Sequence, residues 1–435
     1  MSDLAPAVTP MTPAHRTWRM KIFAATWLSY VGFYFCRKPF TAAKAAIKEQ
    51  HHWSGATIGN IYAAYLIAYA IGQFLASRMG PRLGPRKNVL IGMALSICVT
   101  AAMGISISPW VMAGLIAVNG LAQATGWSGN VGTMANWFHK HERGKVMGAW
   151  STNFTVGAIT AGFVMGMALG GSDDPMVQNW QLCFYTGAGV LAVVWLQFYL
   201  FQRNQPEDVG LPPIDDPVTP VDESRIPVAD EKVSLTKQAW TNLLLIAGFY
   251  FFAKLVRYAI WSWAAYFLEE KYLLSGRAAN IYSIAFDICG IPGVFLTGYI
   301  SDKYFKSRRA GVALVMMIGM TIATVFLILF AGTSVTMFVV LLGAVGFFLY
   351  GPDALLSGAG AMDLGNRRTA TFAAAMISGV GSIGPVVQEV IVPRVYDEKT
   401  AGMTPVFVIL FVSAAMASLF CAALVLRNRR GGRGI

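Results

Sequence analysis

The sequence predicts an all-α membrane protein with twelve transmembrane helices arranged as two similar six-helix bundles. Composition, the spacing of apolar runs and an internal repeat lead to this class. Of the 435 residues, 55% are hydrophobic and 13% are charged, whereas about 25% are charged in a typical soluble protein. Twelve spans of about 20 residues would account for this hydrophobic share. The composition therefore excludes a cytosolic enzyme of one or two domains and a disordered or collagen-like chain.

Apolar runs of about 18 to 28 residues, separated by charged or Gly/Pro-rich breaks, divide the chain into candidate spans. The twelve runs begin near residues 20, 58, 88, 109, 146, 181, 239, 280, 310, 334, 370 and 402. Each run is long enough to cross the hydrocarbon core of a bilayer as a helix. We therefore expect a multi-pass protein whose main non-covalent partner is the lipid bilayer.

Basic residues gather in alternate loops and at both ends of the chain. They precede the first span and follow the second, fourth, eighth, tenth and twelfth spans: Arg16, Arg19, Lys21, Arg78, Arg82, Arg86, Lys87, Lys140, Arg143, Lys145, Lys303, Lys306, Arg308, Arg309, Arg367, Arg368, Arg427, Arg429, Arg430 and Arg433. Because lysine and arginine are enriched in cytoplasmic loops, both termini are predicted to be cytoplasmic. The net charge of +12 thus indicates membrane topology and not a nucleic-acid partner.

A Pro-rich acidic stretch without apolar periodicity interrupts the middle of the chain and is typical of a linker. The predicted organisation is a cytoplasmic N-terminal segment (1–19), a six-helix bundle (20–202), a cytoplasmic linker (203–238), a second six-helix bundle (239–427) and a basic cytoplasmic tail (428–435). The two halves echo each other, since Arg37 in the first span corresponds to Arg257 in the seventh. Parallel halves of this kind indicate a secondary transporter whose substrate binds between them.

Few ionisable residues lie inside the spans, and each one costs free energy to place in the membrane. A charge near the centre of a membrane helix costs about 2.5–3.5 kcal/mol, so each one needs a partner, a water-filled cavity or a ligand. The candidates are Arg37 and Lys38 in the first span, Lys254 and Arg257 in the seventh, and the acids Asp287, Asp353 and Glu389 in the eighth, tenth and eleventh. We expect the acids to serve either in proton coupling or as ion-pair partners.

Arg37 and Arg257 are the strongest candidates for substrate binding. A guanidinium group offers a planar fork of donors that binds phosphate oxygens in pairs and stays charged at cellular pH. Two such groups facing one cavity would suit a divalent phosphate ester, which could bridge them and let the halves close. The alternative is that an intramembrane acid neutralises each arginine, with Asp287 or Asp353 within reach of Arg257.

Aromatic and amide side chains give weaker signals at helical spacing. Tyr30 and Tyr34 share a helix face with Arg37, and Tyr69 and Gln73 lie one turn apart in the second span. The remaining polar candidates are Trp127 and Asn153. Interhelical packing is the alternative role for these residues. The sequence lacks a G-x-x-x-x-G-K-[ST] loop, so we expect no ATP-driven transport, and we expect neither a cofactor nor a metal site.

Several motifs resemble the major facilitator superfamily and, within it, the organophosphate:phosphate antiporters. They are Y-x-x-R-K at Tyr34 to Lys38, NGLAQATGW at 119–127, ANWFHKHERG at 135–144, the run around Arg257-Tyr258, CGIPGVFLTGYISDK at 289–303 and LYGPDALL at 349–356. The resemblance implies electroneutral exchange of a phosphate ester for inorganic phosphate by alternating access. It also implies that Arg37 and Arg257 hold the phosphoryl group, with Tyr30, Tyr34 and Tyr69 as contacts.

Departures from the family pattern affect the cargo and the gate. The glycerol-3-phosphate transporters have a lysine where this chain has Gln73, a histidine where it has Phe154 and a tyrosine where it has Lys254. A hexose phosphate is therefore the expected cargo. In the Gly-x-x-x-Asp loop motif of the superfamily, Ser77 replaces the aspartate after the second span, beside Arg78. After the eighth span the aspartate is present as Asp302. These two loops are the expected gate.

Together, these features predict a transporter of a bacterial inner membrane, and not an enzyme, that exchanges a sugar phosphate for inorganic phosphate. One chain is expected to be a complete transporter. A membrane sensor of external sugar phosphate is one alternative. A proton-coupled organic anion symporter, in which Asp287, Asp353 or Glu389 titrates, is the other.

Overall fold

The computed structural model describes residues 11–138, 143–214, 237–304, 309–356, 367–396 and 402–429. The helices of the first half are α1 (Pro13–Ala42), α2 (Lys44–His51), α3 (Gly55–Met103), α4 (Pro109–Trp137), α5 (Arg143–Trp150), α6 (Thr152–Leu169), η1 (Pro175–Val177), α7 (Trp180–Phe201) and η2 (Pro206–Val209). Those of the second half are α8 (Lys237–Tyr272), α9 (Gly276–Ser283), α10 (Ala285–Tyr304), α11 (Arg309–Phe330), η4 (Ala331–Thr333), α12 (Val335–Ala354), α13 (Arg367–Val395) and α14 (Thr404–Arg429).

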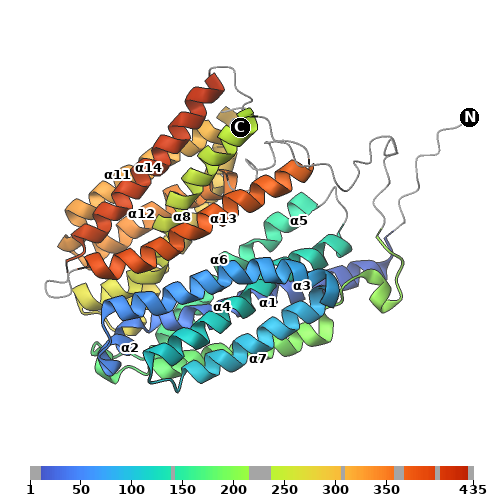
Figure 1. Cartoon of the computed structure of the whole chain (residues 1–435), viewed down its shortest axis with the longest axis horizontal. Coiled ribbons are helices and arrows are strands. Elements are labelled where there is room, and N and C mark those ends of the chain that lie inside the picture. Colours follow the sequence, from blue (N-terminus) through green and yellow to red (C-terminus); the bar gives the residue numbers. More distant parts are fainter. Residues whose placement is uncertain are drawn as a thin grey trace, which may run out of the picture.

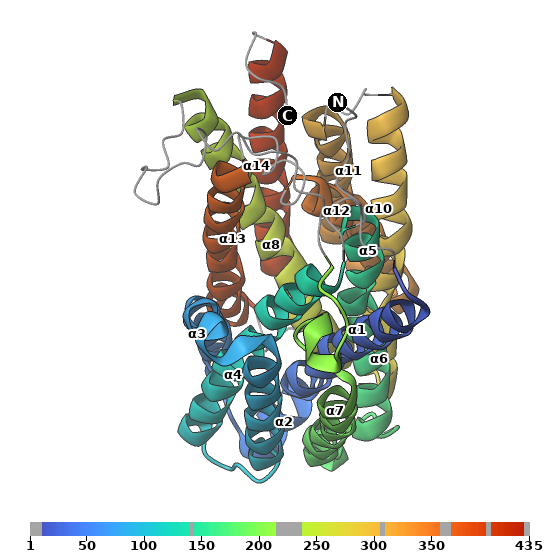
Figure 2. The same cartoon turned by 90° about the vertical axis from the view of Figure 1, so that its right-hand side faces the viewer.

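The long helices form two bundles, one from α1 to α7 and the other from α8 to α14 (Figure 1). The bundles meet at the end of the molecule that carries α2 and diverge toward the end where α1 begins (Figure 1), and Figure 2 shows the molecule from the diverging side. Close approach of α3 to α13 marks the meeting point, because a Cβ at Gly59 would lie 2.4 Å from the carbonyl oxygen of Glu389. We call this end of the molecule, where Lys44 and Glu389 also meet, the closed end.

Each of the twelve expected spans coincides with a helix, and the all-α fold is as predicted. Two expected spans, those near 58 and 88, fall within α3, which is interrupted at Gly84. Gly84 has a φ of 76° and a ψ of 156°, a conformation that glycine adopts far more readily than other residues. The fifth and eighth spans each begin as a short helix, α5 and α9, before the main helix.

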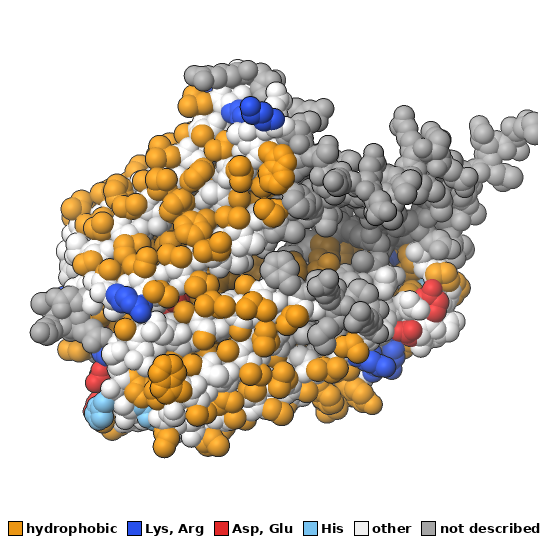
Figure 3. Space-filling view, viewed as in Figure 1, with side chains coloured by type: hydrophobic (Ala, Val, Ile, Leu, Met, Phe, Trp, Pro, Cys, Tyr) orange, Lys and Arg blue, Asp and Glu red, His pale blue; other side chains and the backbone are white. Residues whose placement is uncertain are grey.

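The outer surface of both bundles is apolar. Nine helices in the described part are long and apolar enough to cross a membrane. Large hydrophobic side chains cover the outward faces (Figure 3), and Trp110 is 85% exposed and Phe295 73% exposed. Soluble proteins rarely expose patches of this extent, so these faces contact lipid. The protein is therefore integral to the membrane and crosses it many times.

Polar residues turn inward on the helices that line the interface between the bundles. Arg37 and Lys38 in α1 and Asn119 and Gln123 in α4 are all buried. Hydrocarbon offers no hydrogen-bond partners, so these groups must be satisfied by other protein groups or by a ligand. The interior of the molecule is therefore where a functional site is to be sought.

Candidate substrate site

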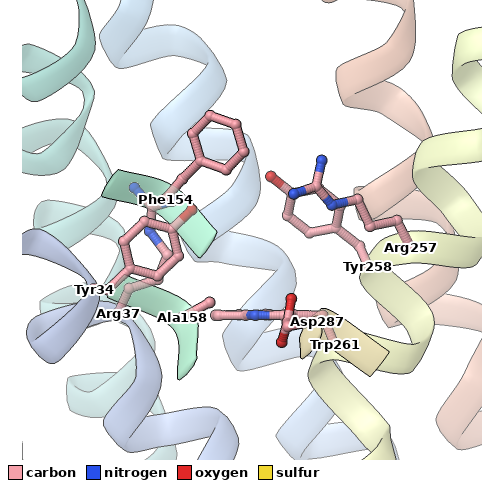
Figure 4. Close-up of a pocket in the computed structure, with 8 residues that line it drawn as sticks. All are labelled: Tyr34, Arg37, Phe154, Ala158, Arg257, Tyr258, Trp261 and Asp287. Atoms are coloured by element: carbon pink, nitrogen blue, oxygen red, sulfur yellow. The ribbon is translucent and has the colours of Figure 1, made fainter. Parts of the chain in front are cut away.

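A cavity of about 340 Å³, part of it open to solvent, lies between the two bundles. Its walls come equally from the two halves: Tyr34, Arg37, Phe154 and Ala158 from α1 and α6, and Arg257, Tyr258, Trp261 and Asp287 from α8 and α10 (Figure 4). The predicted pair, Arg37 and Arg257, therefore faces the same space from opposite bundles. A ligand in this cavity would contact both halves at once.

Arg37 is buried and is held by neutral groups. Its Nε donates a hydrogen bond to Oε1 of Gln123 at 3.0 Å, and its guanidinium group stacks 4.8 Å from the ring centre of Tyr34 and 5.1 Å from that of Tyr69. The terminal nitrogen Nη2 is buried and lacks a hydrogen-bond partner among the residues that the structure describes. A buried cation with an unused donor is costly, and an anionic ligand would offset that cost.

A polar network in the first bundle fixes the position of Gln123. Its Oε1 also accepts a hydrogen bond from the hydroxyl of Tyr65 at 3.0 Å, and its Nε2 donates to Oδ1 of Asn119 at 3.2 Å. Asn119 in turn donates to the carbonyl oxygen of Cys36 at 2.8 Å and accepts from Ser96 at 2.6 Å. The network ties α4 to the backbone of α1 beside Arg37, so the arginine is oriented before any ligand binds.

Arg257 is held differently, by an acid of its own bundle. Its Nη1 lies 2.7 Å from Oδ2 of Asp353 in α12, and its guanidinium group stacks 4.5 Å from the ring centre of Tyr350. The hydroxyl of Tyr350 donates a hydrogen bond to Asp287. Of the two acids expected within reach of Arg257, Asp353 makes the ion pair and Asp287 is bonded to the tyrosine.

The third predicted acid, Glu389, lies outside the cavity. It pairs with Lys44 at the closed end, at 3.1 Å, and accepts a hydrogen bond from the hydroxyl of Ser262. Lys44 belongs to α2, Ser262 to α8 and Glu389 to α13, so the cluster joins the bundles. Glu389 is thus an ion-pair acid, one of the two roles expected for it.

The remaining predicted residues lie around the cavity at varying distances. The amine of Lys38 lies 4.4 Å from the ring centre of Trp261, and that of Lys254 lies 4.7 Å from the ring centre of Tyr250. The ring centres of Tyr30 and Trp127 are 5.4 Å apart. Tyr69 interacts with Tyr30 and with Gln73. None of Lys38, Lys254, Tyr30, Tyr69, Gln73 and Trp127 is among the eight residues that line the cavity.

Asn153 precedes the cavity residue Phe154 and is fully buried, yet neither its Oδ1 nor its Nδ2 has a hydrogen-bond partner in the described structure. Buried amides are almost always satisfied, so this one is a candidate for contact with a ligand. The side chains of the predicted gate residues Arg78 and Asp302 lie outside the described residues.

The sequence did not reveal several residues that the structure places in the cavity or at the closed end. Tyr258 and Ala158 line the cavity but had no polar pattern of their own, although Tyr258 directly follows Arg257. Lys44 was also missed. Its position seven residues after Arg37, on the same helical side, was the available signal.

Comparison with known proteins decides the family. The profile of the Major Facilitator Superfamily matches residues 22–387, most of the chain. The chain belongs to this superfamily. Membership makes it a transporter and not an enzyme, as the sequence predicted.

Curated relatives place this superfamily member among the organophosphate:phosphate antiporters. It is 30% identical to the glycerol-3-phosphate transporter of Bacillus subtilis (strain 168) over 86% of this chain and 85% of that protein. It is 28% identical to the glucose-6-phosphate exchanger SLC37A2 of Mus musculus, over 98% and 96% of the two chains. It is 27% identical to the phosphoglycerate transporter protein of Salmonella typhimurium, over 78% and 75%. The cargoes in these names share a phosphoryl group and differ in the organic part.

Solved structures share the fold at lower identity. A bacterial homologue of the human lysosomal transporter Spinster, in an inward-facing and unoccupied conformation, superposes with a TM-score of 0.73 over 93% of this chain and 97% of that one, at 18% identity. The D-xylose-proton symporter superposes with a TM-score of 0.69 at 14% identity, over 92% and 97%. These similarities establish the arrangement of the helices.

Proposed function

We propose that this superfamily member exchanges an organophosphate for inorganic phosphate by alternating access, and that Arg37 and Arg257 hold the phosphoryl group. One observation carries the proposal: arginines from opposite bundles line one cavity, and Arg37 has neutral partners and a buried, unpaired Nη2. Phosphate oxygens accept paired hydrogen bonds from guanidinium groups, so the anion supplies what Arg37 lacks.

The two arginines have different tasks in this proposal. Arg37 binds the anion with its full charge because only neutral groups hold it. Arg257 is paired with Asp353. When the bundles close, Arg257 can turn from this carboxylate toward the phosphoryl group. Binding therefore couples to closure through the second bundle, and the ligand bridges the halves at the centre of the molecule.

The organic part of the cargo is proposed to be a hexose. Tyr34, Phe154, Tyr258 and Trp261 supply aromatic faces around the cavity. A pyranose ring has an apolar C–H face that packs well on such rings, whereas glycerol presents little flat surface. The glycerol-3-phosphate transporters have a histidine at the position of Phe154. This difference supports the same preference for a hexose. Lys38, Lys254, Tyr30, Tyr69, Gln73, Trp127 and Asn153 are proposed to complete the ligand environment.

The proposed membrane is a bacterial inner membrane, with both termini and the linker at 203–238 on the cytoplasmic side. The closed end then faces outward and the diverging end faces the cytoplasm. The six-helix bundles at 20–202 and 239–427 are proposed to move as the two rigid halves, and Arg78 and Asp302 to act in the loops of the cytoplasmic gate.

Counterflow of labelled phosphate tests the proposal directly. Purified protein is placed in liposomes preloaded with phosphate, and uptake of labelled phosphate is competed with glucose 6-phosphate, glycerol 3-phosphate and phosphoglycerate. We expect saturable uptake that glucose 6-phosphate suppresses at the lowest concentration. Binding without flux would indicate the sensor instead, and uptake that stops when the proton gradient is collapsed would indicate the symporter.

A further inference from the structure

In the described part of the second bundle, three carboxylates lie buried or half-buried at the closed end, and their partners differ. Glu389 pairs with Lys44. Glu270 pairs with Lys48 in α2 at 3.3 Å. Glu269, next to Glu270 in α8, has a side-chain amide as its partner and no cation within salt-bridge distance among the described residues.

Glu269 lies in the interface between the bundles. It is 4% exposed, and its Oε2 accepts a hydrogen bond at 3.2 Å from Nε2 of Gln178, a residue of the first bundle between η1 and α7. Gln178 is itself 3% exposed, and its Nε2 also donates to the carbonyl oxygen of Ser172 at 3.3 Å. The contact between Glu269 and Gln178 therefore exists only while this end is closed.

The pair of side chains has two buried acceptors and too few donors. Within the described ranges of the chain, Oε1 of Glu269 and Oε1 of Gln178 both lack a hydrogen-bond partner. A proton on Glu269 would supply the missing donor and allow an acid–amide pair, in which the acid O–H faces the amide oxygen and the amide N–H faces the acid carbonyl. It would also remove an unpaired charge from a buried site, which is expensive to maintain.

We propose that Glu269 is a proton-binding site that is occupied when the outer end is closed and is emptied when this end opens. Opening separates Glu269 from Gln178 and exposes the carboxyl group to water, which favours its ionised form. The bound proton thus stabilises the closed state, and lower pH on that side shifts the protein toward it. The proposal rests on the alternating access described above and adds a site to it.

The proton is taken from and returned to the same compartment, because the closed end separates Glu269 from the opposite side. The site therefore regulates the access equilibrium and does not use a proton gradient to drive transport. This role differs from that of a coupling acid in a symporter, which must face each side in turn.

The ionisable neighbours of Glu269 in the described structure have partners of their own: Glu270 pairs with Lys48, and the thiol of Cys183 donates to the carbonyl oxygen of Met165. Glu270 follows Glu269 in α8, and the thiol of Cys183 in α7 interacts with Glu269 electrostatically. In α2 the amine of Lys48 is held at 3.1 Å from Glu49 and at 3.3 Å from Glu270.

Distances between spin labels on the full-length protein test the proposal without any transport measurement. Labels at Ile107→Cys in the first bundle and Thr333→Cys in the second, both exposed at the closed end, report opening in a Cys98→Ser background. We expect the open population of the otherwise unaltered protein to rise between about pH 5 and pH 8, with up to about a tenfold change in the open-to-closed ratio per pH unit for one proton. A distance distribution that does not change over this range would overturn the proposal.

Two neighbouring variants separate the site from a general effect of pH. Glu269→Gln has the shape and the neutral charge of the protonated glutamate but cannot release a proton. We therefore expect a closed population that no longer responds to pH. Glu270→Gln, the matched control, should keep the pH response. A response that survives in Glu269→Gln, or disappears in Glu270→Gln, would refute the assignment. Failure of phosphate counterflow with an intact pH response would count against the proposed cargo alone.

Discussion

Arg37 carries a full positive charge among neutral partners, and its planar guanidinium group makes the contacts that hold it there. Arg37→Lys keeps the charge but loses the Nε bond to Gln123 and the paired donors. Since a hydrogen bond to a charged group is worth about 1.5–3 kcal/mol, we expect about a hundredfold weaker phosphate affinity. The apparent affinity for phosphate in the counterflow assay measures this.

The control for that variant is Arg429→Lys, an equally conservative change at an exposed position at the end of α14. It should leave phosphate affinity unchanged. An Arg37→Lys protein with near-normal affinity would show that charge alone binds the anion and would remove the paired-donor role of Arg37.

Individual residues differ in how far the sequence identifies them. Arg37 and Arg257 could be predicted because charge inside a membrane helix requires a reason. The partner of Arg257 could not, because Asp287 and Asp353 lie on different helices and only packing decides which one reaches it. Glu269 was also missed, since a carboxylate near the end of a span gives no sign in the sequence of whether it is buried.

Among the helices, the contact of α3 with α13 depends on the absence of a side chain at Gly59. A Cβ there would lie 2.4 Å from the carbonyl oxygen of Glu389 and 2.5 Å from Cγ of Pro393, so the backbone would have to move. We expect Gly59→Ala to push the two helices apart and raise the open population at this end. The spin-label pair at 107 and 333 measures the shift.

Gly114→Ala provides the matched comparison, since a Cβ at that position meets nothing within 4 Å. It should leave the distance distribution as it is. Equal distributions for Gly59→Ala and the unaltered protein would mean that α3 and α13 adjust without opening, and the close approach would then have no part in gating.

The positions of the long helices follow from apolar run length, and so does the break in α3 at Gly84, which lies between the expected spans near 58 and 88. The separate helix α2 was not predicted, because a short turn between polar residues satisfies backbone groups in ways that hydropathy does not register. Yet α2 carries Lys44 and Lys48, which contact the second bundle.

Across the whole molecule, the cluster of Lys44, Ser262 and Glu389 joins three helices at the closed end. Lys44 and Glu389 have no exposed side-chain surface. Removing one member of a buried ion pair leaves an uncompensated charge, at a cost of about 3–5 kcal/mol. We expect Lys44→Met to lower the free energy of unfolding in detergent by about that amount.

The double variant Lys44→Met with Glu389→Gln removes both charges and should recover most of the loss, as measured by denaturant unfolding of the four proteins of the cycle. Strictly additive losses in the double variant would show that the two charges do not depend on each other, and the cluster would then have no stabilising role between the bundles.

The length and number of the apolar runs predicted an all-α membrane protein with twelve spans, because these runs and the cost of buried charge are properties of the chain and the bilayer. The sequence motifs carried the resemblance to the major facilitator superfamily, which the family profile confirmed. The three-dimensional packing, by contrast, pairs Asp353 with Arg257 and Lys44 with Glu389, and it gives Glu269 the amide of Gln178 as its partner. Those pairings join helices far apart in the chain. Their choice depends on how the two bundles pack, which no local pattern in the sequence encodes.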